Sequence, residues 1–274
     1  MRILHISTRL ILGGSQENTV LSCEGQARLG HEVHLAFGPI YGPEGSLLAR
    51  VESFNKRCAS GEEATHDGGV CKPIRTHTVP HLLRQISPLD DWRCYGELRA
   101  LIREIRPDIA HTHSSKAGIL ARAAAWKEAT SNAATGNASS HGALGIVHTI
   151  HGPPFHRYQS RFLHRLYVAS ERFAARRCHA IVSVADAMTR QYLAEGIGRA
   201  DQYVTVYSGM ETNRVLDAPP GERRATRESL GLCDSDFVIG TVSRLAELKG
   251  HDDLLDALGD DLKAHPNWKL LWVG

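Results

Sequence analysis

The apolar residues of this chain fall into short runs separated by longer stretches with helical spacing. Strands that alternate with helices in this way are typical of an α/β domain with a parallel sheet. Three helical stretches, residues 16–29, 90–106 and 185–195, end at Gly30, Pro107 and Gly196, residues that stop helices. The runs predicted as buried strands are residues 3–6, 33–37, 109–110, 146–150, 180–184 and 204–207.

A further apolar run near the end of the chain, Phe237–Val242, leads into a loop that contains Arg244 and Lys249. Residues 251–265 then have helical spacing, with a stripe of leucines on one face. Two cations between a strand and a helix N-terminus suit an anion, above all phosphate or diphosphate. The alternative is a solvated surface loop without a ligand.

The polar stretch at residues 217–235 contains Pro219, Pro220 and Gly221 and is predicted to be a linker. It separates a first domain, residues 1–216, from a second, residues 236–274. Strand, helix and strand are too little for an independent α/β core, so the second domain is expected to be incomplete. Residues 55–72 and 130–142 are polar or of low complexity and are predicted to be surface insertions.

Composition narrows the class of protein only a little. The chain has 274 residues, with 32 Lys and Arg against 30 Asp and Glu, so its charge gives no argument for nucleic acid as a partner. Its six cysteines lie far apart without a C-x-x-C pair, which fits reduced thiols and a cytoplasmic location. We expect no signal peptide and no membrane span.

Ligands of open parallel sheets gather at the carboxyl ends of the strands, so the loops there hold the candidate site residues. Gly13 and Gly14 follow the first strand and open a helix. Glycines allow a ligand to approach the backbone closely, and a helix N-terminus favours negative charge. The pattern is not G-x-G-x-x-G, so a dinucleotide site is unsupported, and a purely structural turn explains the two glycines equally well.

Two more of these loops contain histidine. The segment H-T-H-S-S-K-A-G, residues 111–118, places Ser114, Ser115 and Lys116 at a helix start, where they suit a polar or phosphorylated ligand. One of the serines could instead be a simple N-cap. The segment T-I-H-G-P-P-F-H, residues 149–156, holds His151 rigidly next to two prolines, which favours a functional role.

Read together, these segments resemble glycosyltransferase family 4. The resemblance runs from Met1 to Gly274, interrupted by the two insertions, and it depends on the order of the motifs more than on any one of them. The motifs are the Gly-Gly loop, H-T-H-S-S-K-A-G, H-T-I-H-G-P-P-F-H, V-S-V-A-D-A-M, T-V-Y-S-G-M-E and G-T-V-S-R-L-A-E-L-K-G.

The resemblance implies a GT-B fold, in which two Rossmann-like domains enclose the active site, and a retaining transfer of a sugar from a nucleotide-diphosphate donor to a hydroxyl acceptor, without a metal. Polysaccharide, glycolipid or lipid-linked glycan assembly is the implied setting. Arg244 and Lys249 match the basic pair that holds the donor diphosphate, and Gly13 and Gly14 the loop near the phosphates. His151 matches the histidine near the transferred sugar. The segment with His113, Ser114, Ser115 and Lys116 matches the acceptor side.

One departure from the family pattern concerns the donor half. Family members have two glutamates, eight positions apart, further along the second domain, and this chain ends before that region. The activity of the chain as given is therefore open, and a non-catalytic protein that binds glycans or lipid-linked sugars is an alternative. A metal-dependent hydrolase with His111, His113 and His151 as ligands is another. A zinc loop at Cys58, His66, Cys71 and His77 has irregular spacing and is disfavoured.

The stretch from Ser160 to Cys178 combines five arginines with aromatic and aliphatic residues at helical spacing. Enzymes that act on lipid-linked acceptors often dock on anionic membranes through such helices. Peripheral contact with the inner face of the membrane is therefore one reading. A helix that packs on the core and exposes a charged face is the other.

Overall fold

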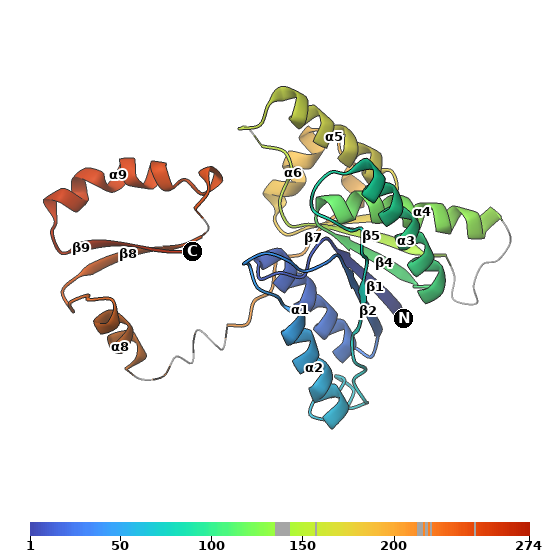
Figure 1. Cartoon of the computed structure of the whole chain (residues 1–274), viewed down its shortest axis with the longest axis horizontal. Coiled ribbons are helices and arrows are strands. Elements are labelled where there is room, and N and C mark those ends of the chain that lie inside the picture. Colours follow the sequence, from blue (N-terminus) through green and yellow to red (C-terminus); the bar gives the residue numbers. More distant parts are fainter. Residues whose placement is uncertain (135–142, 157, 213–215, 217–218, 220, 244) are drawn as a thin grey trace. The chain divides into compact units, whose positions relative to one another are not determined.

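The computed structural model describes residues 1–134, 143–156, 158–212, 216, 219, 221–243 and 245–274. The chain forms two compact units, Met1–Met210 and Glu211–Gly274, and each is described here by itself. In Figure 1 they are the blue-to-orange and the red parts of the chain.

The first unit is built on a seven-stranded sheet with the strand order β3-β2-β1-β4-β5-β6-β7. Every neighbouring pair is parallel, which confirms the predicted α/β class. All six strands predicted for this unit are present with shifted ends. The strands are β1 (Arg2–Ser7), β2 (Glu32–Phe37), β3 (Arg75–Thr78), β4 (Ile109–His113), β5 (Gly145–Ile150), β6 (Ala180–Ser183) and β7 (Tyr203–Thr205).

Helices cover both faces of this sheet, on opposite sides of the strands in Figure 1. Val33 and Leu35 of β2 pack in a core with α1 and α2, whereas Leu4 and Ile6 of β1 pack in a second core with α3 and α4. The helices are α1 (Gly14–Arg28), α2 (Leu48–Ser60), α3 (Pro88–Ile105), α4 (Ser115–Ala134), α5 (Arg161–Ala175), α6 (Asp186–Ala194) and the 3-10 turn η1 (Ala200–Gln202).

Two elements escaped the sequence analysis. Strand β3 has the polar sequence R-T-H-T and lies at the edge of the sheet, where burial is incomplete and an apolar run is not required. Residues 55–60, predicted as the start of an insertion, are instead the second half of α2. The reason is that Val51, Phe54 and Cys58 form one buried stripe of that helix. Of the second predicted insertion, residues 130–134 belong to α4, and 135–142 lie outside the described residues.

The second unit contains a parallel pair of strands, β8 (Phe237–Val242) and β9 (Trp268–Val273). Helix α9 (His251–Ala264) connects them, as the leucine stripe predicted, and the short turn η2 (Glu247–Lys249) precedes it. Helix α8 (Glu222–Ser229) lies within the stretch predicted as a linker. The strand–helix–strand unit expected at the start of a second Rossmann-like domain is therefore present.

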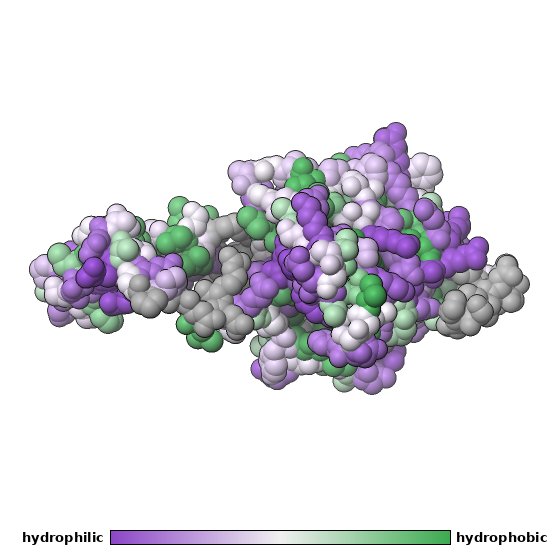
Figure 2. Space-filling view, turned by 90° about the horizontal axis from the view of Figure 1, so that it is seen from below, coloured by the Kyte–Doolittle hydropathy of each residue, from purple (hydrophilic) through white to green (hydrophobic). Residues whose placement is uncertain are grey.

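The surface in Figure 2 is mostly hydrophilic, with hydrophobic residues scattered over it. Across the described residues, the structure contains no helix with both the length and the apolar character needed to span a bilayer.

Candidate functional site

Strand β4 ends in a tight turn that leads directly into α4. His113 is its last residue, and Ser114 follows with a φ of 62°, in the left-handed region that non-glycine residues rarely adopt. Such a conformation costs on the order of 1–3 kcal/mol and recurs at functional sites. The Ser114 hydroxyl lies 2.7 Å from the Thr8 hydroxyl, and the Ala117 amide of α4 donates to Thr8 Oγ1 at 3.3 Å. Ser114 thus bonds to the β1 end instead of capping its own helix through its side chain.

Histidines from β1, from the end of β4 and from the residue after β5 form a continuous hydrogen-bonded chain beneath this turn. His5 Nδ1 lies 2.9 Å from His113 Nε2, and His113 Nδ1 lies 3.1 Å from His151 Nε2. At the other end, His5 Nε2 lies 2.7 Å from Oε1 of Gln26 in α1. The sequence analysis missed His5, although a single polar residue within the apolar run of β1 was a usable signal. We call Gln26, His5, His113 and His151 the histidine chain.

The histidine chain is uncharged at neutral pH. Burial lowers the pKa of His5 to about 4, although the hydrogen bond with Gln26 opposes the shift, and burial also lowers the pKa of His151 to about 4. Burial, followed by the neighbouring histidines, holds the pKa of His113 well below its usual range. A neutral imidazole has one donor and one acceptor nitrogen, which is what a chain of ring-to-ring hydrogen bonds requires.

His111 lies beside this chain and completes a cluster whose geometry bears on metal binding. One ring nitrogen from each of His5, His111 and His113 lies within 4.8 Å of the others. His111 Nε2 lies 2.7 Å from the Thr149 hydroxyl. The predicted hydrolase site contained His151 instead of His5. In the structure these imidazoles form hydrogen bonds with one another, with Gln26 and with Thr149, and these bonds compensate for the burial of polar nitrogens. No comparable cluster forms among the described residues around Cys58 and Cys71.

Gly13 and Gly14 lie at the start of α1, where the fold itself does not demand glycine. Gly13 has an extended φ of 175°, which any residue can adopt. A Cβ atom on Gly13 would meet only the flexible side chain of Gln16, and one on Gly14 would meet nothing within 4 Å. Both residues are exposed. The free space above them is what a ligand close to the backbone would need.

The remaining residues predicted for the acceptor side have different surroundings. Ser115 is the first residue of α4 and is half-buried. Lys116 Nζ lies 2.5 Å from Asp91 Oδ1 of α3 and also donates to the carbonyl of Gln85. The charge of Lys116 is therefore compensated within the protein, and a ligand phosphate would have to compete with Asp91 for it.

In the second unit, Lys249 is the last residue of η2, is separated from α9 by Gly250 and is exposed. This is the strand–loop–helix arrangement that the sequence predicted. Asp252 and Asp253 occupy the first turn of α9 and already balance part of the helix dipole. An anion there would depend on side-chain cations more than on the helix. Arg244 lies outside the described residues.

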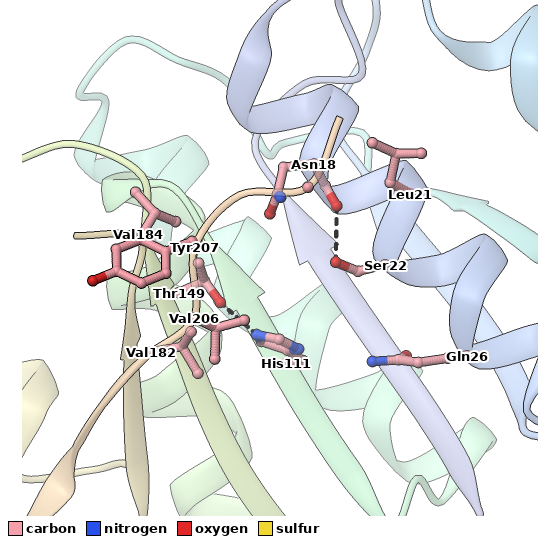
Figure 3. A pocket seen from close by; sticks show the side chains of 11 residues that line it. Asn18, Leu21, Ser22, Gln26, His111, Thr149, Val182, Val184, Val206 and Tyr207 are labelled. Atoms are coloured by element: carbon pink, nitrogen blue, oxygen red, sulfur yellow. Dashed lines mark hydrogen bonds between the residues drawn. The ribbon is translucent and has the colours of Figure 1, made fainter. Parts of the chain in front are cut away.

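A cavity of about 360 Å³ opens on the α1 side of the first sheet. Figure 3 shows Asn18, Leu21, Ser22 and Gln26 of α1 on one side of it and side chains from β4 to the segment after β7 on the other. Only the Gln26 end of the histidine chain reaches this cavity. It is lined by Asn18, Leu21, Ser22, Gln26, His111, Thr149, Val182, Val184, Val206, Tyr207 and Gly209.

The structure therefore brings some of the predicted residues together and leaves others apart. His113 and His151 are in direct contact, and Ser114 follows His113 immediately. Gly13, Gly14 and Lys116 belong to the same unit but make no hydrogen bond to these residues within the described part of the chain. Lys249 belongs to the other unit.

Comparison with known proteins finds relatives that match part of this chain and solved structures that share its fold. A galactosyltransferase of Escherichia coli, named as acting on UDP-Gal and α-D-GlcNAc-diphosphoundecaprenol, is 35% identical over 103 residues, 38% of this chain and 23% of that protein. A GDP-mannose-dependent phosphatidylinositol monomannoside mannosyltransferase of Corynebacterium glutamicum is 40% identical over 67 residues, 24% of this chain and 18% of that protein. The chain thus matches less than a quarter of each relative's length.

Among solved structures, Anabaena HepE in complex with UDP superimposes on 99% of this chain with a TM-score of 0.64 and 18% identity. The matched part is 60% of HepE. This similarity confirms the predicted GT-B type of fold. A model of the glycosyl transferase 4-like domain matches residues 13–209, from the Gly-Gly loop to the segment after β7. Because that match covers more than half of the chain, the protein belongs to the glycosyl transferase 4-like family.

Proposed function

We propose that this protein is a glycosyltransferase that moves a sugar, with retention, from a nucleotide-diphosphate donor to a hydroxyl of a glycan or lipid-linked acceptor. The observation that carries the proposal is the convergence of the family-matched segment on one sheet edge. There, within the family-matched segment, the ends of β4 and β5 bring His113 into a hydrogen bond with His151, and Ser114 bonds to Thr8 after β1. Ligands bind at this edge in open parallel sheets.

His151 is the residue that we place next to the transferred sugar. Its imidazole is held by His113 and is neutral at pH 7, so it can exchange hydrogen bonds with sugar hydroxyls without placing a fixed charge beside them. The half-buried Ser114 and Ser115 supply hydroxyls on the acceptor side. Lys116 would serve a phosphorylated acceptor only by leaving Asp91.

For the donor diphosphate we propose Lys249 and Arg244 as the cations that bind it, and we propose that the open backbone at Gly13 and Gly14 admits a phosphate. Lys249 forms no ion pair with any described residue, so its charge is available for a ligand. A cation on the departing diphosphate stabilises charge that develops in the transition state. We propose that this chemistry needs no bound metal. The E. coli and C. glutamicum relatives are named for UDP- and GDP-linked donors, and both nucleotides are therefore tested.

The test is a transfer assay with the full chain. Purified protein is incubated with UDP- or GDP-linked sugars and a polyprenyl-diphosphate-linked sugar, and release of nucleoside diphosphate is followed with and without EDTA. Release that requires both substrates and survives EDTA supports the proposal, and the anomeric configuration of the product tests retention. Binding of the acceptor without any turnover would favour the non-catalytic alternative.

Helix α5 offers a surface through which the protein would reach a lipid-linked acceptor. Its inner face is buried through Val168, Glu171 and Ala174, so the helix packs on the core as one reading of the sequence required. Its outer face exposes Phe162, Leu166 and Phe173, at 79%, 44% and 46%. Exposed arginines share that face: Arg161, Arg165 and Arg172 in the helix and Arg176 directly after it. Apolar side chains among arginines suit an anionic membrane.

Vesicle sedimentation tests this membrane contact separately from catalysis. We expect binding to vesicles with phosphatidylglycerol and little binding to pure phosphatidylcholine. Phe162→Ser with Phe173→Ser should reduce the bound fraction, while Val70→Ser, which changes an exposed residue far from α5 in the sequence, should not. Equal binding of both variants would remove α5 as the contact.

A further inference from the structure

The histidine chain places three imidazoles in the layer between α1 and the first sheet, where an α/β fold normally packs aliphatic residues. His5 is fully buried and His113 is 2% exposed. Buried polar groups destabilise a protein unless they are hydrogen-bonded, and aliphatic residues would fill the same space without that requirement. A chain of polar side chains that runs from Gln26 in α1 to the sheet edge therefore calls for a reason beyond folding.

The hydrogen bonds of the histidine chain all run in one direction, because the role of each ring nitrogen, donor or acceptor, determines the role of its partner. Gln26 Oε1 can only accept, so His5 donates from Nε2 and its Nδ1 is left as an acceptor. His113 then donates from Nε2 to His5, and its own Nδ1 becomes an acceptor. His151 consequently donates from Nε2 to His113. The remaining nitrogen of His151, Nδ1, keeps its lone pair, and no described residue is hydrogen-bonded to it.

We infer that Gln26 and His5 are positioning residues, which act through His113 to fix His151 as the tautomer with a proton on Nε2 and an acceptor at Nδ1. This inference rests on the proposed function for its use of His151, although the tautomer itself does not. An acceptor nitrogen suits a hydroxyl of the sugar or of the acceptor, which donates. It does not suit a phosphate oxygen, which needs a donor. The burial that keeps these rings neutral preserves the arrangement at physiological pH.

Two substitutions of Gln26 distinguish the effect of its hydrogen-bond acceptor on the histidine chain from the effect of its packing. Gln26→Met keeps an unbranched side chain of similar length at a half-buried helical position but removes the acceptor. Gln26→Glu restores an acceptor that cannot reverse its role when ionised. Ser22→Ala is the matched control: it changes a side chain one turn earlier on α1 that donates to the Asn18 carbonyl and to no other described residue.

The readout is the ¹⁵N–¹H correlation spectrum of the imidazoles in histidine-labelled full-length protein, which distinguishes protonated from bare ring nitrogens. We expect His151 to be protonated at Nε2 in the wild type, in Gln26→Glu and in Ser22→Ala. In Gln26→Met the tautomer ratio should move by about fivefold, the factor of one ordinary hydrogen bond. A proton on Nδ1 of wild-type His151, or an unchanged ratio in Gln26→Met, would overturn the inference.

Two additional measurements keep this inference apart from its alternatives. Added Zn²⁺ should leave the His5 and His113 signals in place, and stoichiometric loss of those signals would replace the proton chain with a metal site. Turnover of the Gln26 variants is measured separately: kcat should fall in Gln26→Met and recover in Gln26→Glu. Absence of any transfer by the wild type would contradict the proposed function and leave the tautomer result intact.

Discussion

The two predicted halves of the site differ in how far the protein itself has built them. At the edge of the first sheet, His5, His113 and His151 are bonded to one another and most of their surface is buried. In the second unit, Lys249 stands exposed on a three-residue turn without an ion pair among the described residues. The first half is a hydrogen-bond network formed within the protein itself. The second is a cation that no described residue neutralises.

This difference indicates which substitutions should change stability and activity together and which should change activity alone. Groups that are fixed by the protein contribute to both, because removing one leaves its buried partners unsatisfied. A solvated cation contributes little to the free energy of unfolding, since surface charges have small effects there. Substitutions in the first half should therefore change stability together with activity, and substitutions in the second half should change activity alone.

The largest expected effect comes from the exposed half. Lys249→Ala should lower the turnover of a nucleotide sugar by about 100-fold, as loss of one group that stabilises transition-state charge typically does. The midpoint of urea unfolding should stay the same. The control is Lys263→Ala, which removes another exposed lysine of the second unit, in the last turn of α9. Equal loss in both variants would mean that Lys249 has no specific role.

The pH dependence of stability tests the first half of the site, where the histidines are buried. His5 has a pKa of about 4 in the folded protein and about 6.5 when unfolded. Between these values the unfolded chain binds the extra proton, so stability is lost as the pH falls from about 6.5 towards 4. His5 alone should cost about 2 kcal/mol at pH 5 relative to pH 7.5. Urea unfolding at the two pH values measures the loss, and His5→Gln should reduce it. A flat profile would contradict the buried, neutral state of the chain.

Packing around the α4 start gives a third, somewhat smaller effect. A Cβ atom on Gly118 would lie 2.5 Å from Cε1 of the buried His148, whose Nδ1 lies 2.9 Å from the Thr112 hydroxyl. Gly118→Ala should therefore lower the free energy of unfolding by roughly 1–2 kcal/mol. Gly96→Ala in α3, where a Cβ meets nothing, should raise it slightly. Thermal melts of both variants decide, and a stabilised Gly118→Ala would show that the His148 ring moves aside freely.

The sequence predicted those elements and residues that a local pattern of apolar or loop residues determines. Short apolar runs predicted six strands of the first sheet, because strands of a parallel sheet are covered by helices on both faces and are rich in apolar residues. The edge strand β3 and the part of α2 taken for an insertion lacked that signal. In the site, His113 and His151 were found as candidates from their loops. The bond between His5 and His113 joins residues 108 positions apart, and the pairing of Lys116 with Asp91 depends on how α3 and α4 pack. No pattern along the chain determines such contacts.

The smallest expected change in stability is that of Gly14. Its substitution therefore tests directly whether a ligand needs the open backbone at this position. Because a Cβ there meets no atom of the protein and the position is helical, Gly14→Ala should change the free energy of unfolding by less than about 1 kcal/mol, in the stabilising direction. Gly25→Ala, in the same helix and equally uncrowded, should behave in the same way. Only Gly14→Ala should raise the KM for the nucleotide sugar, by about tenfold if the methyl group displaces a diphosphate from the backbone. If steady-state kinetics gave both variants the wild-type KM, Gly14 would be an ordinary helix start, and the first unit would contact the donor elsewhere.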